Sequence, residues 1–211
     1  MVRTLAVYIT FYSNWVALLS LDVVIVFILE SPWFERDRRS HRRWIRSRGE
    51  LLFNDAGLCF QQWQSCASCH PDGRADGFNW DLTNDGLGNP NNTRGLLLTH
   101  RTPPVMSLAV RETAETAVRS GQQFIQFAHC SEDDAQAIDE YLKSLTLVES
   151  PYRRQGSLSD AARRGEKVFT DSGCAACHRG QWLTDQKSYD VGTRTSLDQD
   201  KPLDTPTLTE V

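Results

Sequence analysis

The first part of the chain is a long apolar segment. Residues 5–29 are almost continuously apolar and are interrupted by the polar side chains of Asn14 and Asp22. About 20 apolar residues in a row suffice for a helix to cross a bilayer. The sequence that follows, residues 30–33, does not resemble the small-residue cleavage site of a secretory signal peptide. The pattern therefore predicts an uncleaved membrane anchor. The alternative is that roughly the first 45 residues are not a native leader.

A basic segment follows the apolar one directly. By the positive-inside rule, an arginine-rich flank stays in the cytoplasm, which would leave the rest of the chain there as well. The alternative is that these arginines form a solvated linker. We assign residues 1–47 to the apolar anchor or leader and its arginine-rich flank. The arginines of this stretch are Arg36, Arg38, Arg39, Arg42, Arg43, Arg46 and Arg48.

From residue 48 onward the pattern of polar and apolar positions repeats, and such a repeat indicates two related structural units. Each copy predicts a helix, a cysteine motif, a loop and a Thr-Pro turn, in that order. The first copy also has an insertion before its motif, which contains Cys59. The matching positions are Arg48-Gly49-Glu50, Phe53 and Asp55 with Arg164-Gly165-Glu166, Phe169 and Asp171, and Thr102-Pro103 with Thr205-Pro206.

Only the first copy continues into a further amphipathic helix. Ser131 is a suitable N-cap with Asp134 three residues later, and apolar residues then recur at steps of three and four. These apolar residues are Ala135, Ile138, Leu142 and Leu145. The printed sequence ends at Val211, a few residues after the second Thr-Pro pair, so we expect the second copy to be truncated. The alternative is a short second module that packs on the first.

Each copy contains one Cys-x-x-Cys-His motif, which is an attachment pattern for c-type haem. Two thiols three positions apart lie about one helical turn from each other, so both can add to the vinyl groups of one porphyrin. The adjacent imidazole then faces the iron as its proximal ligand. Zinc would require four nitrogen or sulfur ligands in a closed site, and each motif offers three. The sequence therefore predicts two covalently bound haem c groups, on Cys66, Cys69 and His70 and on Cys174, Cys177 and His178.

Patterns typical of strands are almost absent, so we predict a mainly α fold with two tandem cytochrome c-like haem domains after the N-terminal apolar segment. The first domain is assigned to residues 48–146 and the second, incomplete one to residues 159–211. Residues 147–158 are polar and have no apolar periodicity, which predicts an exposed linker.

The formal net charge of −4 gives no basic excess, so nucleic acid is not an expected partner.

The haem motifs also bear on the location of the chain. Attachment of haem to cysteine pairs in bacteria is typical of the outer face of the inner membrane. The arginine-rich flank favours the cytoplasm instead. We give the motifs more weight because they are specific and occur twice. The expected location is therefore the periplasmic side, attached to the inner membrane through residues 5–29.

Beyond the motifs, the sequence resembles the bacterial di-haem cytochrome c peroxidase family over residues 48–211. The resemblance implies that the first haem binds hydrogen peroxide and reduces it to water. The second haem would receive electrons from a small cytochrome or a cupredoxin, and calcium is a further implied cofactor. Proteins on this scaffold oxidise other substrates too, so an electron carrier without turnover is the alternative. The residues that carry the resemblance are Arg48 to Phe53, Cys66 to Gly73, Gly86, Gly88 and Thr102-Pro103.

The distal ligands are where this sequence departs from the family. No His or Met follows His178, although the second haem of such proteins usually has a Met ligand further along its own domain. For the first haem the candidates are Met106, His100 and His129. Met106 follows the Thr-Pro-Pro turn, where a cytochrome c presents its thioether, but a Met beside prolines is equally suited to a core. The two histidines are better explained as solvent-facing or hydrogen-bonded residues.

Peroxide cleavage requires a group that moves a proton between the two oxygens. The resemblance implies an acid after the Thr-Pro turn, and Glu115 matches its position better than Glu112. Both could instead belong to the solvated face of a helix.

Two cysteines lie outside the haem motifs, Cys59 and Cys130. They could form a disulfide in an oxidising compartment, but we favour two unpaired thiols.

Overall fold

The computed structural model describes residues 32–82, 85–154, 156–193 and 195–209 of the chain. The chain divides into two compact units, residues 1–44 and residues 45–211. The predicted membrane anchor, residues 5–29, lies outside the described residues. Among the residues that are described, no helix has the length and apolar character needed to span a bilayer.

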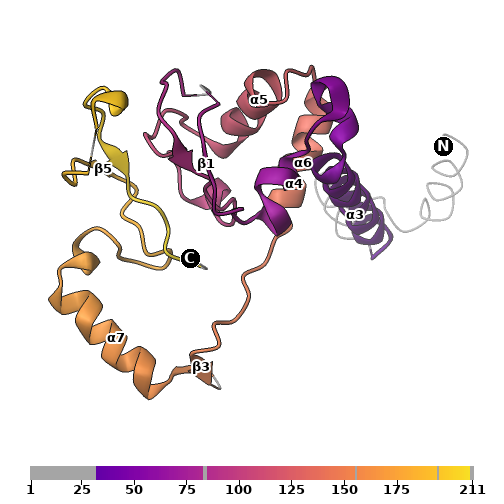
Figure 1. Cartoon of the computed structure of the whole chain (residues 1–211). Helices are drawn as coiled ribbons and strands as arrows, with labels where there is room; N and C mark the ends of the chain where they lie inside the picture. Colours follow the sequence, from indigo (N-terminus) through magenta and orange to yellow (C-terminus); the bar gives the residue numbers. More distant parts are fainter. Residues whose placement is uncertain (1–31, 83–84, 155, 194, 210–211) are drawn as a thin grey trace, which may run out of the picture. The chain divides into compact units, whose positions relative to one another are not determined.

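The described chain is mostly helical, as the sequence predicts, with short antiparallel strand pairs between the helices (Figure 1). The α-helices are α3 (Pro32–Asn54), α4 (Cys66–Cys69), α5 (Ala114–Phe124), α6 (Glu132–Ser144) and α7 (Asp160–Asp171). Short 3-10 helices cover Ala56–Leu58, Phe60–Gln62, Pro71–Gly73, Thr99–Arg101, Cys174–Ala176 and Ser196–Asp198. The strand pairs are β1 (Asn79–Trp80) with β2 (Asn91–Asn92), β3 (Arg153–Arg154) with β4 (Ser157–Leu158), and β5 (Ser188–Tyr189) with β6 (Leu203–Asp204).

The helix α6 forms where the periodicity predicts it. The hydroxyl of Ser131 accepts a hydrogen bond from the backbone N–H of Asp134 at 3.2 Å, which satisfies one of the unpaired donors of the first turn. The apolar positions Ala135, Ile138 and Leu142 are buried. The expected N-cap and apolar face of this helix are therefore confirmed.

The hydrophobic core lies entirely in the first copy. Among the described residues, every buried apolar side chain falls between Phe53 and Leu142. The side chains of Phe53 and Ile138 are each 1% exposed, and the ring of Phe53 lies 5.3 Å from that of Tyr141. Helices α5 and α6 pack against each other beside this cluster. The core thus joins the helix before the first haem motif to the helix that closes the copy.

The helices α3 and α6 cross at Gly49, where the two backbones approach closely. A Cβ atom on Gly49 would lie 1.9 Å from the carbonyl oxygen of Ala137 and 2.9 Å from the Cβ of Tyr141. The neighbouring residue Arg48 donates from Nε to Oδ1 of Asp134 at 2.8 Å, and Asp134 lies about one turn before Ala137 on α6. The repeated glycine therefore has a packing function in the first copy, because any larger residue would push the two helices apart.

The second copy has the same order of helix and motif but no comparable core. Its helix α7 begins after Ser159, whose hydroxyl accepts from the backbone N–H of Ala162 at 3.2 Å. None of the α7 residues is buried. No described atom lies within 4 Å of a Cβ placed on Gly165, the match of Gly49. The predicted linker, residues 147–158, ends in the β3–β4 hairpin, and the division into two haem domains stays a prediction.

Candidate haem sites

The first haem motif is presented by a single helical turn. In α4 the backbone N–H of Ser65 donates to Ser68 Oγ at 3.0 Å, which holds the start of the turn. The turn places Cys66 and Cys69 on the same side, and His70 ends it. All three motif residues line one cavity of about 810 Å³. The arrangement is the one that attachment of a single porphyrin through two thioether bonds requires.

This cavity has the size and the lining that a large apolar cofactor needs. Small-molecule and cofactor sites are typically about 300–1,000 Å³ and mostly apolar, with a few polar groups. The apolar wall comes from α3, α5, α6 and the loop before the Thr-Pro turn, so the core of the first copy is also the wall of the site. Its apolar members include Phe53, Leu96, Leu97, Val118, Ile125, Ile138 and Leu142. The residues present therefore fit a haem group.

The imidazole of His70 is oriented for iron binding. Its Nδ1 lies 3.3 Å from the carbonyl oxygen of Arg74, which makes Nδ1 the protonated nitrogen and leaves Nε2 as the metal-binding atom. Burial lowers the pKa of His70, which favours the neutral form that binds a metal.

The second motif repeats this histidine geometry at the surface. The Nδ1 atom of His178 lies 3.1 Å from the carbonyl oxygen of Leu183, and the ring of Phe169 lies 6.5 Å away. Cys174 is exposed, and none of the three motif residues lines the first cavity. Both histidines thus have the backbone hydrogen bond of a proximal ligand, but of the two only His70 lines this cavity.

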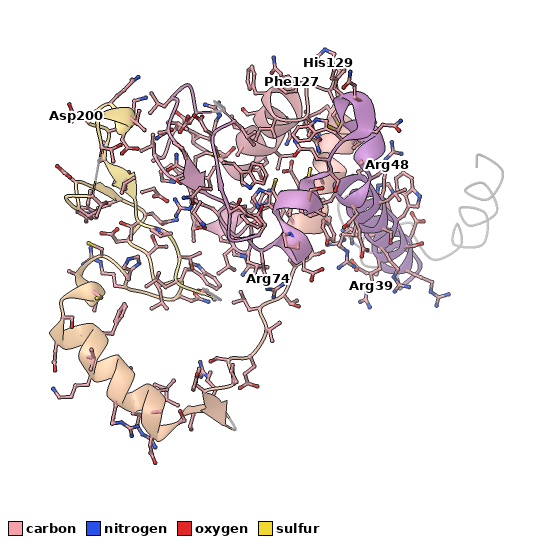
Figure 2. All side chains as sticks on the ribbon, viewed as in Figure 1. Arg39, Arg48, Arg74, Phe127, His129 and Asp200 are labelled. Carbon is pink, nitrogen blue, oxygen red and sulfur yellow. The ribbon has the colours of Figure 1, made fainter. Side chains whose placement is uncertain are left out.

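The structure separates the three candidates for the distal ligand. Met106 lines the cavity with His70, and its carbonyl oxygen accepts from Arg94 Nη1 at 3.2 Å. His100 is instead buried against Asp139, with 3.1 Å between Nε2 and Oδ1. His129 is exposed at the outer edge of the α5–α6 connection (Figure 2). Met106 remains the candidate ligand, and its binding to iron stays a prediction.

The two predicted catalytic glutamates do not line the cavity. The α5 residues that do so follow one helical face, from Ala114 through Val118 to Ile125. Glu115 is rotated by about 100° from Ala114, so it leaves that face. Its carboxylate lies 3.3 Å from Lys143 Nζ, and its side chain is 42% exposed. Glu112 is exposed as well. Neither glutamate lines the cavity in the part of the chain that the structure describes, and their catalytic role stays a prediction.

Sequence reasoning missed a polar wall of the cavity, which comes from both copies. Arg94 and Asp204 line it together, with 3.3 Å between Arg94 Nη1 and Asp204 Oδ2. Asp204 immediately precedes the second Thr-Pro turn, and its backbone N–H donates to the carbonyl oxygen of Ser107 at 2.9 Å. The repeat marks this turn in the sequence, but nothing in the pattern shows that it lies against the cavity of the other copy.

Further contacts hold the second copy to the first. Asn89 Nδ2 donates to Asp198 Oδ1 at 2.9 Å, and Gln186 Nε2 donates to the carbonyl oxygen of Arg101 at 3.3 Å. The guanidinium of Arg101 lies 5.5 Å from the centre of the Trp182 ring, within the range of a cation–π interaction. The segment that carries Asp204 is thus fixed at several points along its length.

The two cysteines outside the motifs are free thiols in this structure. Cys59 is buried, and its Sγ lies 3.4 Å from the carbonyl oxygen of Gln126. Cys130 is half-buried. No disulfide links them.

The comparisons with known proteins point to haem proteins. No family model matches the chain. It is 31% identical to hydrazine synthase subunit gamma of Kuenenia stuttgartiensis over 166 residues, which are 69% of this chain and 47% of that protein. The chain therefore spans about half the length of this relative.

Two solved structures have a similar fold. The hydrazine synthase of Kuenenia stuttgartiensis, pressurised with 20 bar xenon, matches with a TM-score of 0.64 and 26% identity, over 78% of this chain and 70% of that one. A MauG-like protein associated with microbial copper homeostasis matches with a TM-score of 0.59 and 18% identity, over 78% and 66%, which shows a shared fold alone.

Together with the two motifs, these similarities support a cytochrome c-like di-haem protein with a redox function. They also support haem c as the cofactor. They do not select the peroxidases within this group.

Proposed function

We propose that the chain is a di-haem c-type redox protein that reduces hydrogen peroxide at its first haem, with electrons that enter through the second. The observation that carries this proposal is the difference between the two motifs. The first lines a large, mostly apolar cavity with one polar wall, whereas none of the second motif's residues lines that cavity and Cys174 is exposed. A small substrate fits the cavity of the first site, and a redox protein can approach the exposed second one.

The residues of the first site have separate tasks. Cys66 and Cys69 would form the thioether bonds, and His70 would bind the iron through Nε2. When bound, haem c supplies one-electron redox chemistry at its iron. The hydrogen bond to the carbonyl of Arg74 holds the imidazole ring in the required tautomer. The apolar wall would cover the hydrophobic faces of the bound porphyrin.

The second motif is suited to electron entry. A surface site shortens the distance to a docked donor, for which we propose a small cytochrome or a cupredoxin. The two copies are connected through Arg101 with Trp182 and, at the wall of the cavity, through Arg94 with Asp204. We propose that electrons arriving at His178 pass toward the first cavity through these contacts between the copies.

The experiment that tests the haem assignment is a pyridine haemochrome assay on protein made where haem attachment machinery is present. We expect two haems per chain that remain bound after denaturation. A value near one or zero would contradict the assignment. Mixing the reduced protein with hydrogen peroxide then separates an enzyme from an electron carrier, since only the enzyme consumes peroxide catalytically.

A second candidate function rests on the similarity to hydrazine synthase subunit gamma. The chain would then be a subunit of a related assembly that handles small nitrogen compounds. Reduction of the oxidised haems by hydrazine, without catalytic consumption of peroxide, would favour this candidate. Rapid peroxide turnover by the isolated protein would favour the first.

We also propose that residues 5–29 anchor the chain to the inner membrane, with the haem sites on the periplasmic side. The proposal is supported by the length of the apolar run and by the compartment that haem attachment requires. Alkaline extraction of membranes should leave the protein in the pellet. Recovery in the soluble fraction with an intact N-terminus would contradict the anchor.

A further inference from the structure

Asp204 is a buried carboxylate in the first haem cavity, although it belongs to the second copy. Its side chain is 7% exposed and lines the same cavity as His70 and Met106. One carboxylate oxygen, Oδ2, lies 3.3 Å from Arg94 Nη1. The other, Oδ1, is buried and has no hydrogen-bond partner in the part of the chain that the structure describes. Because buried polar atoms are nearly always paired, this oxygen is available to a small molecule in the cavity.

The position of this carboxylate is set by its neighbours. Its backbone is fixed to the carbonyl of Ser107, which directly follows Met106. The antiparallel pairing of β5 with β6 holds the segment from the other side. Arg94 is itself tied to the carbonyl of Met106, so the guanidinium bridges the candidate ligand loop and the carboxylate. Asp204 therefore meets the geometric requirement for a proton-transfer group, which is a fixed place beside the reacting site.

We propose that Asp204, held by Arg94, is the proton acceptor and donor of the first haem cavity. This inference rests on the proposed reduction of peroxide. Reduction of one hydrogen peroxide breaks the O–O bond, uses two electrons and two protons, and yields two waters. The Asp204 carboxylate accepts the proton of the peroxide oxygen that is nearer the haem. It returns this proton to the other peroxide oxygen, which leaves as water. The remaining protons come from solvent, and both electrons come from the redox donor through the haems.

The electrostatics of the site agree with this role. Burial raises the pKa of Asp204 to about 6, an effect that Arg94 opposes and the nearby carboxylate of Asp185 reinforces. An acid that titrates near the working pH is present in both forms, so it can accept and donate the same proton. Glu115 pairs with a surface lysine outside the cavity and has neither property.

The test compares Asp204→Asn with Asp200→Asn in the full-length protein loaded with haem. Both variants remove one carboxylate from the same segment, but Asp200 is exposed (Figure 2). We expect Asp204→Asn to retain both haems and to react with peroxide about 10²-fold more slowly or worse, whereas Asp200→Asn matches the wild type. Asp204→Glu, which keeps a carboxyl group, should recover part of the rate.

A second measurement does not depend on peroxide. Reduction of the first haem adds an electron near Asp204 and should favour uptake of a proton by it. The reduction potential of the wild type should therefore change with pH around 6, and Asp204→Asn should remove this dependence. If the wild type has no peroxide activity, the proposed substrate is wrong, but a potential that loses its pH dependence in Asp204→Asn still supports the proton-transfer role. An unchanged rate and an unchanged pH dependence in Asp204→Asn would overturn the inference, as would a loss of activity confined to Glu115→Gln.

Discussion

Replacement of Gly49 by alanine should destabilise the first haem domain, whereas the same change at Gly165 should not. The two glycines hold matching positions in the repeat and both lie inside a helix. A Cβ on Gly49 would meet the carbonyl oxygen of Ala137 at 1.9 Å, but a Cβ on Gly165 has no described atom within 4 Å. Comparing Gly49→Ala with Gly165→Ala therefore separates the effect of packing from the intrinsic preference of a helix for alanine over glycine.

The magnitude follows from two opposing contributions. Alanine is favoured over glycine in a helix interior by about 0.8–1 kcal/mol, and this gain applies to both positions. A carbon and an oxygen in van der Waals contact are more than 3 Å apart, so α3 and α6 must separate by over an ångström at Gly49. Forcing extra atoms into a packed contact costs about 1–3 kcal/mol and occasionally more. The atom that obstructs the new Cβ belongs to the backbone, so we expect a packing cost at the upper end of this range at Gly49. After the gain in helix preference is subtracted, the free energy of unfolding should fall by about 2 kcal/mol.

Thermal unfolding followed by circular dichroism measures the difference. For a compact unit the size of residues 45–211, 1 kcal/mol shifts Tm by about 2–4 °C, so Gly49→Ala should lower Tm by about 4–8 °C. Gly165→Ala should leave Tm unchanged or raise it slightly. Haem content should be measured for both variants, so that a loss of cofactor is not mistaken for a loss of packing. Equal Tm values for the two variants would refute the proposed crossing of α3 and α6.

Three further predictions concern the haem site and its support. Changing Cys66 and Cys69 together to alanine should remove one haem and leave the other, as a haemochrome assay would show; loss of both haems would contradict independent sites. Met106→Ala should lower the reduction potential of the first haem if the thioether binds iron, whereas an unchanged potential would assign Met106 to the cavity wall. Asp139→Ala should cost about 3–5 kcal/mol in denaturant unfolding, because Arg119 and His100 would both lose their buried carboxylate partner. A loss below about 1 kcal/mol would show that this buried pair contributes little.

The local features of this protein can be predicted from its sequence because they depend on residues close together in the chain. The Cys-x-x-Cys-His spacing places two thiols and an imidazole on one turn, whatever lies around them. The N-cap Ser131 and the apolar positions of α6 follow from helical periodicity, and the structure confirms them. The repeat likewise predicts a helix before each motif. These features require only the geometry of a helical turn.

The tertiary structure decided which side chains meet. Glu115 is adjacent to the cavity-lining Ala114 in sequence, yet it lies on another face of α5, because the direction of a helical side chain depends on which face packs against the core. Asp204 reaches the cavity only because the segment around it pairs with residues about one hundred positions earlier in the chain. Gly49 and Gly165 are equivalent in the repeat, but among the described residues only Gly49 has a helix packed against it. Such long-range contacts depend on how distant segments pack, which the local pattern of a sequence does not specify.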